Sequence, residues 1–596
     1  MPISRIMDKA LGLSVVKGSG MLTDEDFIRY TAALREDPDG QNIRAELLDL
    51  RAADFDLSPS GVRRVVDFDR RILSDYAELK RALVVSTDLQ YSLARLYVQL
   101  MTPQGVEVEA FRDLDAARKW LGLPAEEQEV EKRVAGEARA AVTSAAIKSA
   151  IDFARGRRGD HVNELNEFLS IQSISDDPTK RDEMIRAAEW LVDRLTELGA
   201  KNAELVATEG HPVVYGEMLD AGPKAPTVLV YGHYDVQPVS SPEDWSTDPF
   251  TPVEVGGNLV GRGTSDMKGQ IMACIAAIEA VVETVGLPVN IRFVLEGEEE
   301  VGSPHFESFL EGNLDRLACD VVLNTDAGML GPDDPTIFYG LRGMYSCRLR
   351  VSGPSEDLHS GGYGGVIHNP IHALSLLIAG LHDAEGRVQL PDFYKSVRPM
   401  TNDEREMMEA LPLDEEAYLE QSGADSLWGE PEYLPAERAG ARPALDIIQF
   451  RAGSAKSAIP ADAEAVVTVR LVPDQIPADV HEQFVSYLAK NTPPTVRWEI
   501  VEWKGFPAVL TDRSSPGITA MGAAMESIWG KGPLFYRSGG SIAAVGHLKA
   551  VLGVDSVMTG FSLPDDHIHG PNEHLHLSTW GRGIEALIHF LHNFAR

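Results

Sequence analysis

The chain has 596 residues, of which 44% are hydrophobic and 24% charged, a composition typical of soluble globular proteins with more than one domain. Its 91 Asp and Glu against 55 Lys and Arg give a net charge of -36, which argues against nucleic-acid and membrane partners because phosphates and anionic lipids would be repelled. The three cysteines lie far apart without CxxC spacing, so the sequence indicates neither a disulfide framework nor a thiolate zinc site. Without a visible signal peptide or membrane-spanning run, we expect a cytoplasmic protein.

The first 125 residues alternate between strand-like apolar runs, such as LSVVKG, AELLDL and ALVVS, and segments of helical character. This alternation predicts a small α/β domain over residues 1–125. No cluster of acidic, histidine or cysteine side chains occurs there, and we assign no catalytic role to it. Residues 126–158 are charged, Ala-rich and full of helix formers, which predicts a helical linker.

The remaining residues predict an α/β core that is interrupted by a second domain. Over residues 159–338 the apolar runs TVLVYG, IRFVLEG and VVLNTD alternate with helical segments, which indicates a largely parallel sheet covered on both faces. Residues 339–536 contain two alternating strands, MYSCRLRVSG and EAVVTVRLVP, separated by an acidic stretch, a pattern typical of an antiparallel α+β lobe. Residues 537–596 return to strand and helix and complete the core.

The run TVLVYGHYDVQP, residues 227–238, has an apolar, β-branched start and a polar end. His233 and Asp235 are two residues apart, so they leave the strand on the same side. Ligands bind at this end of the strands in open α/β sheets. A His-x-Asp pair alone is more often a hydrogen-bonded loop pair than a metal ligand with its orienting carboxylate, so its meaning depends on further partners.

Further ligand-type side chains follow strands or lie in Gly-rich turns: Asp266 in GRGTSDMKG, Glu299 and Glu300 in LEGEEEVGS, Asp326 in LNTDAG, and His569 in DDHIHGPNE. Singly, each is better explained as a helix cap, a solvated loop, a turn residue or a surface histidine. Together, carboxylates at one edge of a sheet would repel one another unless cations neutralised them. Two imidazoles and three carboxylates suit one or two Zn²⁺, Mn²⁺ or Co²⁺ ions.

Six motifs, in chain order, resemble those of the M20 metallopeptidases: YGHYDVQP, GRGTSDMKG, EGEEEVGS, TDAG, DLHSGGYGG and DDHIHGPNE. Within that family the resemblance is to the carnosinase-type dipeptidases, and it covers about residues 150–596. It implies a zinc-exopeptidase-like catalytic domain, in which residues 339–536 form an inserted lid and dimerisation domain.

The resemblance also implies two divalent cations, expected to be Zn²⁺ with Mn²⁺ or Co²⁺ as alternatives. They would be held in pairs with one shared carboxylate: His233 with Glu300, Asp326 with His569, and Asp266 as the bridge. Asp235 would fix the tautomer of the metal-binding histidine. Glu299 would be the general base that takes a proton from the water between the metals and passes it to the leaving amine.

The same resemblance assigns roles to residues of the inserted domain and of the last segment. It implies a homodimer, in which His359 reaches across the interface to stabilise the oxyanion. It implies that the substrate's C-terminal carboxylate is bound by a guanidinium and by a Gly-rich turn, groups that suit an anion: Arg470, Ser457, Gly539, Gly540 and Ser541. Read without it, His359 caps a turn, Arg470 is a surface arginine, and the two glycines make a turn.

The function we expect is metal-dependent cleavage of the amide bond in dipeptides or short peptides with a free C-terminal carboxylate. Three positions depart from the dipeptidases: Ser538 stands where they carry Glu, and Ala327 and Gly328 replace a polar or aromatic pair. These departures leave recognition of a free α-amine open and keep an N-acyl-amino-acid amidohydrolase with the same metals as the alternative. A partner-binding protein with a degenerate metal site is disfavoured, because the ligand and base positions are all present.

Residues 1–125 resemble SpoIIAA-like, STAS-related domains, both in their alternation of elements and in the stretch FRDLDAARKWLGL. This resemblance implies an α/β fold for the domain. It assigns no function to it.

Overall fold

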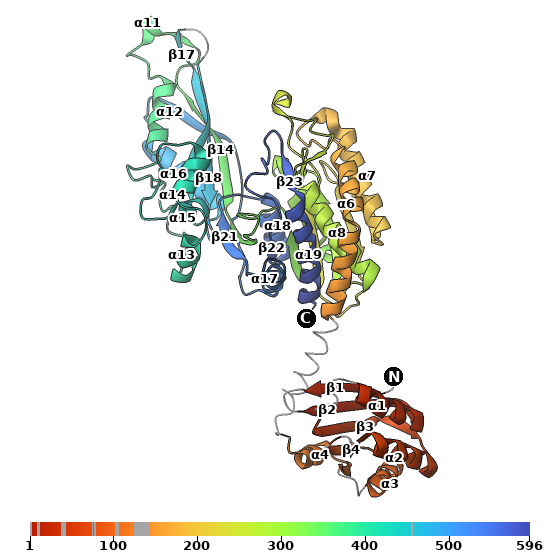
Figure 1. The fold of residues 1–596 in the computed structure, drawn as a ribbon. Helices are drawn as coiled ribbons and strands as arrows, with labels where there is room; N and C mark the ends of the chain where they lie inside the picture. The colour runs from red at the N-terminus through yellow and green to blue at the C-terminus, as the bar shows by residue number, and fades with distance from the viewer. Residues whose placement is uncertain are drawn as a thin grey trace. The chain divides into compact units, whose positions relative to one another are not determined.

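The computed structural model describes residues 3–8, 12–36, 43–73, 76, 79–101, 106–123, 143–453 and 457–595. The chain divides into two compact units, Met1–Ala145 and Ala146–Arg596 (Figure 1). Residues 126–142 of the predicted linker lie outside the described part, whereas residues 143–156 are helical. In the described ranges, no helix combines the length and the apolar character needed to cross a membrane.

The first unit is a five-stranded sheet with helices on both faces. Its strands lie in the order β1 (Ile3–Asp8), β2 (Leu13–Thr23), β3 (Ala45–Asp56), β4 (Lys80–Val84), β5 (Glu107–Phe111). All neighbours are parallel except β1 and β2. The helices are α1 (Asp24–Glu36), α2 (Pro59–Leu73), α3 (Asp88–Met101) and α4 (Leu114–Leu121). The expected alternation of strands and helices is present, although β1 was not expected. The resemblance to STAS-related domains stays a prediction.

A nine-stranded sheet forms the centre of the second unit. Its order is β20 (Val509–Leu510), β13 (Thr336–Leu341), β22 (Ser556–Met558), β12 (Val321–Asn324), β8 (Thr227–His233), β11 (Asn290–Glu296), β7 (Val213–Met218), β6 (Lys201–Val206), with β21 (Leu534–Ser538) also on β13. The four strands β22, β12, β8 and β11 are parallel, and antiparallel pairing begins on either side of them. A small sheet beside it contains β9 (Val253–Val255), β10 (Asn258–Val260) and β23 (His574–His576).

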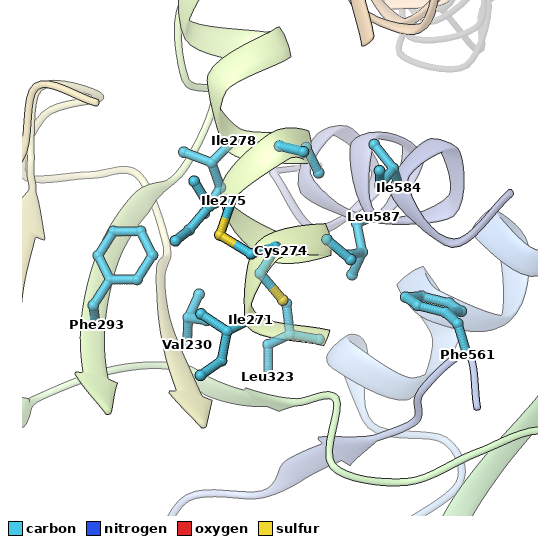
Figure 2. Close-up of a cluster of buried hydrophobic side chains, with 14 of the residues drawn as sticks. Val230, Ile271, Cys274, Ile275, Ile278, Phe293, Leu323, Phe561, Ile584 and Leu587 are labelled. Atoms are coloured by element: carbon cyan, nitrogen blue, oxygen red, sulfur yellow. The ribbon is translucent and has the colours of Figure 1, made fainter. Parts of the chain in front are cut away.

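Helices cover both faces of the central sheet. One face carries α6 (Arg158–Leu169), α7 (Arg181–Glu197), α8 (Lys268–Thr284), α17 (Pro516–Trp529) and α19 (Leu577–Phe594). The other carries α9 (Phe306–Gly312) and α18 (Ala543–Leu552), with α10 (Leu314–Leu317) after α9. Figure 2 shows α8 between the strands and α19, with Val230 and Phe293 on one side of Ile275 and with Leu587 on the side of the terminal helix. This enclosure explains the apolar run IMACIAAIEAVV and makes α8 a rigid support for the residues that precede it.

An antiparallel sheet with helices forms a lobe beside the central sheet (Figure 1). Its strand order is β16 (Ala444–Ala452), β18 (Asp462–Leu471), β14 (Gly343–Ser352), β19 (Arg497–Phe506). The short strands β15 (Leu358–His359) and β17 (Ala458–Ile459) pair at its far end, next to α11 (Ser360–Tyr363). Its larger helices are α12 (Pro370–Ala379) and α16 (Pro477–Asn491), and the acidic stretch forms α13 (Asn402–Glu409), α14 (Glu415–Ser422) and α15 (Pro435–Gly440). The role of this lobe as a lid and dimerisation domain stays a prediction.

Candidate metal centre and substrate cavity

Three neighbouring parallel strands bring the predicted ligands to one edge of the central sheet. The register pairs Glu296 of β11 with His233 of β8, and Asn324 of β12 with Tyr231 of β8, so the three strands end within two residues of one another. The segments that follow them carry Glu299, Glu300 and Asp326. Asp266 lies just before α8, and His569 lies in the loop between β22 and β23. The sheet topology therefore explains why residues distant in sequence meet here.

Two groups of ligand atoms share Asp266. On one side, the Nε2 atom of His233 lies 3.1 Å from Oδ1 of Asp266 and 3.6 Å from Oδ1 of Asp326. On the other, Nε2 of His569 lies 2.8 Å from Oδ2 of Asp266 and 3.2 Å from Oε2 of Glu300. The expectation that His233 pairs with Glu300, and Asp326 with His569, is therefore wrong: the observed pairs are His233 with Asp326 and Glu300 with His569.

The electrostatics of these groups fit divalent cations. Nδ1 of His233 donates a hydrogen bond to the backbone carbonyl of Asp235 at 3.0 Å, so Nε2 is the nitrogen that faces two carboxylate oxygens. Burial lowers the pKa of His233, but the neighbouring carboxylates outweigh it and raise this pKa, and a cation between these groups would take the place of the Nε2 proton. Burial and repulsion among the neighbouring carboxylates raise the pKa values of Glu299, Glu300 and Asp326. Oε1 of Glu300 is buried and has no hydrogen-bond partner in the part of the chain that the structure describes. Cations between these groups would remove the repulsion and use the lone pairs.

Asp235 positions more than the histidine. Its carboxylate accepts hydrogen bonds from the backbone N–H groups of Glu299 at 3.3 Å and Glu300 at 3.1 Å, at the start of the short 3-10 helix Glu299–Val301. Oδ1 of the same carboxylate lies 3.4 Å from Nδ1 of His233, farther than the carbonyl oxygen that accepts the histidine's hydrogen bond. The backbone carbonyl of Asp235 therefore accepts the histidine's hydrogen bond, whereas its carboxylate orients the two consecutive glutamates.

Sequence reasoning missed the buried ion pair that shapes the turn before α8. The carboxylate of Glu573 accepts from Nη1 of Arg262 at 2.7 Å and from the backbone N–H groups of Gly263, Ser265 and Asp266 at 3.0 to 3.1 Å. Both charged side chains are almost completely buried. The peptide bond that follows Asp266 is cis. Glu573 stands inside the motif DDHIHGPNE, so its place in that motif was the available signal.

Two further features hold the remaining ligands. Nε2 of Gln237 donates to Oε2 of Glu300 at 2.8 Å, and Gln237 belongs to the same run, TVLVYGHYDVQP, as His233. His569 has a φ of 62°, and its loop neighbours His567 and Asn572 have φ values of 55° and 59°. Such left-handed conformations cost about 1–3 kcal/mol each in residues other than glycine and persist where the surroundings impose them. Asn572 is so held, because its Oδ1 accepts from the backbone N–H and the hydroxyl of Ser246 at 2.7 Å.

A cavity of about 580 Å³ opens beside the metal centre and extends toward the inserted lobe. It is lined by Glu299, by four of the five candidate metal ligands (Asp266, Glu300, Asp326 and His569), and by apolar side chains from several elements: Phe338, Leu341, Met344, Phe506, Ile542 and Ile568. Of the predicted substrate-binding residues, it includes Arg470, Gly540 and Ser541, and Nη1 of Arg470 donates to Oγ of Ser541 at 2.8 Å.

Sequence reasoning missed a second arginine, Arg342, which lies near Arg470 and the Gly-rich turn. Burial and the positive charge of Arg470 lower the pKa of Arg342 to about 10. Its Nε donates to the carbonyl oxygen of Gly539 at 3.1 Å, so it supports the Gly-rich turn. Arg470 forms no salt bridge with any residue in the described part of the chain. Two cationic side chains at a polar turn form a suitable site for an anion.

His359 and Ser457 do not line the cavity of their own chain. Both are exposed at the far end of the inserted lobe, where the hydroxyl of Ser360 donates to the carbonyl oxygen of Ser457 at 3.3 Å and β15 pairs with β17 (Figure 1). Ala327, Gly328 and Ser538, the three departures, do line the cavity. A Cβ atom at Gly328 would lie 2.7 Å from the hydroxyl of Ser562, so this close approach disfavours a larger residue.

Comparison with known proteins connects this geometry to a family. Residues 229–593 match the profile of peptidase family M20/M25/M40. The chain is 30% identical to the Cys-Gly metallodipeptidase of Schizosaccharomyces pombe over 460 residues, which are 74% of this chain and 96% of that protein. Among solved structures, an M20 family metallo-carboxypeptidase of Sulfolobus solfataricus superimposes with a TM-score of 0.65 and 30% identity over 73% of this chain and 99% of the other. Human carnosine dipeptidase 1 has a TM-score of 0.64 and 27% identity over 75% and 98%.

Glu573→Gln tests the turn before α8. The amide replaces an acceptor of backbone N–H groups with a donor and leaves Arg262 buried without its counter-charge, so Asp266 loses its fixed position. We expect the affinity for Zn²⁺, measured by competition with a chelating dye, to fall about 10- to 100-fold. Glu254→Gln, at an exposed glutamate of β9, is the matched control. Unchanged Zn²⁺ affinity in a folded Glu573→Gln protein would show that the turn is held by other contacts.

Proposed function

The chain belongs to peptidase family M20/M25/M40 and is a metallopeptidase, and we propose that it is a dinuclear dipeptidase that cleaves dipeptides or short peptides with a free C-terminal carboxylate. The observation that carries this proposal is the position of Asp266, whose two oxygens face two separate groups of ligand atoms. Glu299 lines the same cavity and belongs to neither group. A free carboxylate beside two ligand sets is the arrangement that a hydrolytic centre needs.

The chemistry divides between the cations and the side chains. When bound, two divalent cations, for which we propose Zn²⁺, polarise the scissile carbonyl and make a water molecule acidic enough to lose a proton near neutral pH. Glu299 accepts this proton and delivers it to the leaving amine, and Asp235 holds its backbone in place for both transfers. The apolar wall of the cavity accommodates the substrate's side chains and excludes water from the reacting bond.

The substrate's C-terminal carboxylate is proposed to bind at Arg470, Ser541 and the N–H groups near Gly540, with Arg342 adding positive charge. The cavity supports this orientation, because its described acidic lining residues all belong to the metal centre and to Glu299. The names of the relatives agree with a substrate that has a free C-terminal carboxylate, since one relative is a metallo-carboxypeptidase and two are dipeptidases. The alternative of an N-acyl-amino-acid amidohydrolase is therefore not favoured.

A homodimer is proposed to complete the site. His359 and Ser457 are exposed at the end of the lobe and absent from the cavity of their own chain, which supports a role in the cavity of a second copy. There, His359 would stabilise the oxyanion of the tetrahedral intermediate. The cytoplasmic location and the STAS-like nature of the first unit stay predictions.

Glu299→Gln tests the general base. The amide retains the shape of the side chain but cannot accept the proton, so we expect turnover of dipeptides to fall at least about 100-fold while the Zn²⁺ content is unchanged. Glu298→Gln is the matched control, because Glu298 is the preceding residue and its carboxylate pairs with His305 at 2.8 Å. A Glu299→Gln enzyme with full metal content and near-normal turnover would refute the assignment.

Arg470→Gln tests recognition of the carboxylate. Loss of a charge-assisted hydrogen bond worth about 1.5–3 kcal/mol lowers kcat/KM about 10- to 100-fold for a dipeptide with a free C-terminus. The slower hydrolysis of the same dipeptide amidated at its C-terminus should not change. Equal losses on both substrates would place Arg470 in a structural role instead. Arg348→Gln, a half-buried arginine of β14, is the control.

Mixing two inactive variants tests the shared site. A His359→Ala chain lacks the oxyanion donor and a Glu299→Gln chain lacks the base, but a dimer with one of each has one complete site. After subunit exchange at equal amounts, we expect about one quarter of wild-type activity, since half of the dimers are mixed and half of their sites are complete. Mixed dimers that are shown to form and have no activity would contradict the proposal.

A further inference from the structure

A second cluster of ligand-type side chains lies outside the candidate metal centre, on β23 and on the turn that ends at Asp566. His574 and His576 are the two ends of β23, so they project from one face of the strand, and Leu575 between them is fully buried. One ligand atom from each of Asp565, His574 and His576 lies within 4.8 Å of the other two. None of the three belongs to the groups around Asp266. We call these three residues the β23 cluster.

Two polar atoms without hydrogen-bond partners face each other beside the β23 cluster. Asp566 is completely buried, and its Oδ2 accepts hydrogen bonds from the hydroxyl of Ser265 at 2.5 Å and from the backbone N–H of Leu563 at 2.9 Å. Among the described residues, its Oδ1 has no hydrogen-bond partner, and neither does Nε2 of His576, which lies 3.6 Å away. The same nitrogen lies 3.5 Å from Oδ1 of Asp565.

These separations are long for a hydrogen bond but suit ligands of one metal ion. An N–H···O bond has a typical length of about 2.9–3.0 Å. Two ligand atoms bound to tetrahedral Zn²⁺ at about 2.0–2.1 Å are about 3.3–3.4 Å apart. The distances at His576 are therefore close to the spacing of ligand atoms around zinc.

The other histidine is already oriented for metal binding. Nδ1 of His574 donates to the backbone carbonyl of Asn572 at 3.0 Å, which leaves the Nε2 lone pair available. Metal-binding histidines commonly use their second nitrogen in this way, because the bond fixes the tautomer and the ring orientation. The Asp565 side chain is 69% exposed, so an ion can reach the cluster from solvent.

We propose that the β23 cluster binds a third divalent cation, Zn²⁺, with the buried Oδ1 of Asp566 as an additional oxygen next to His576. Such a cation links both ends of the loop 565–574, which carries His569, and supplements the backbone hydrogen bond from His574 N–H to the Asp566 carbonyl at 3.0 Å. Asp566 also holds Ser265, the residue before the shared Asp266. The cation therefore stabilises two segments that contribute ligands to the main centre.

Metal counting tests this site directly. The full-length, metal-free chain is dialysed to equilibrium against Zn²⁺, and bound zinc per chain is measured by elemental analysis. The wild-type chain is expected to retain one equivalent more than the His574→Gln/His576→Gln double variant. His567→Gln, at an exposed histidine of the same loop outside the cluster, is expected to match the wild type. Equal zinc content in the wild type and the double variant overturns the proposal.

A second variant covers the case in which the double variant does not fold. Asp565→Asn changes an exposed side chain and leaves β23 intact. It is expected to lower the affinity for the additional zinc ion at least about 10-fold. Unchanged affinity in Asp565→Asn overturns the proposal in that case. The test compares the zinc content of the wild type with that of a variant. If the main centre holds fewer than two cations, both zinc contents fall by the same amount, and the difference between them remains one equivalent.

Discussion

The second unit is organised by one electrostatic constraint: carboxylates gathered in a buried site repel one another unless cations lie between them. The common end of β8, β11 and β12 brings Glu299, Glu300 and Asp326 together, and Asp266 joins them from the start of α8. Burial and mutual repulsion raise the pKa values of the three residues that follow the strands. The proposed cations on either side of Asp266 would convert this repulsion into binding.

Other buried carboxylates act on the backbone instead of on the metals. Asp235 accepts the N–H groups of two consecutive glutamates, and Glu573 accepts those of the turn that contains Asp266. In each case a buried anion is satisfied by several donors, which is the condition for placing a charge in the interior. The precision of the centre depends on these contacts, because they fix the peptide units that carry the ligands.

The sequence was sufficient for the parts of this architecture that are local. Apolar runs predicted β8, β11 and β12, and the polar residues just after them were recognised as candidate ligands. The alternation in MYSCRLRVSG likewise predicted β14, whose residues alternate between buried and half-buried. These features depend on a few consecutive residues, so a pattern in the chain is enough to reveal them.

The features that escaped prediction depend on long-range contacts. The pairing of His233 with Asp326 follows from the positions of distant loops around Asp266, and the sequence order suggested another pairing. Arg262 and Glu573 are 311 residues apart, and either side chain alone reads as an ordinary surface charge. The proposed role of Arg342 can be inferred only from the fold, which places this residue near Arg470. Such contacts exist only in the folded chain.

Anomalous X-ray scattering from crystals of the zinc-loaded protein can show whether two cations share Asp266. We expect two peaks about 3.5–4 Å apart, one bonded to His233 and Asp326 and the other to Glu300 and His569, with one oxygen of Asp266 on each. A single peak in a fully loaded crystal, or two peaks of which only one contacts Asp266, would contradict this expectation.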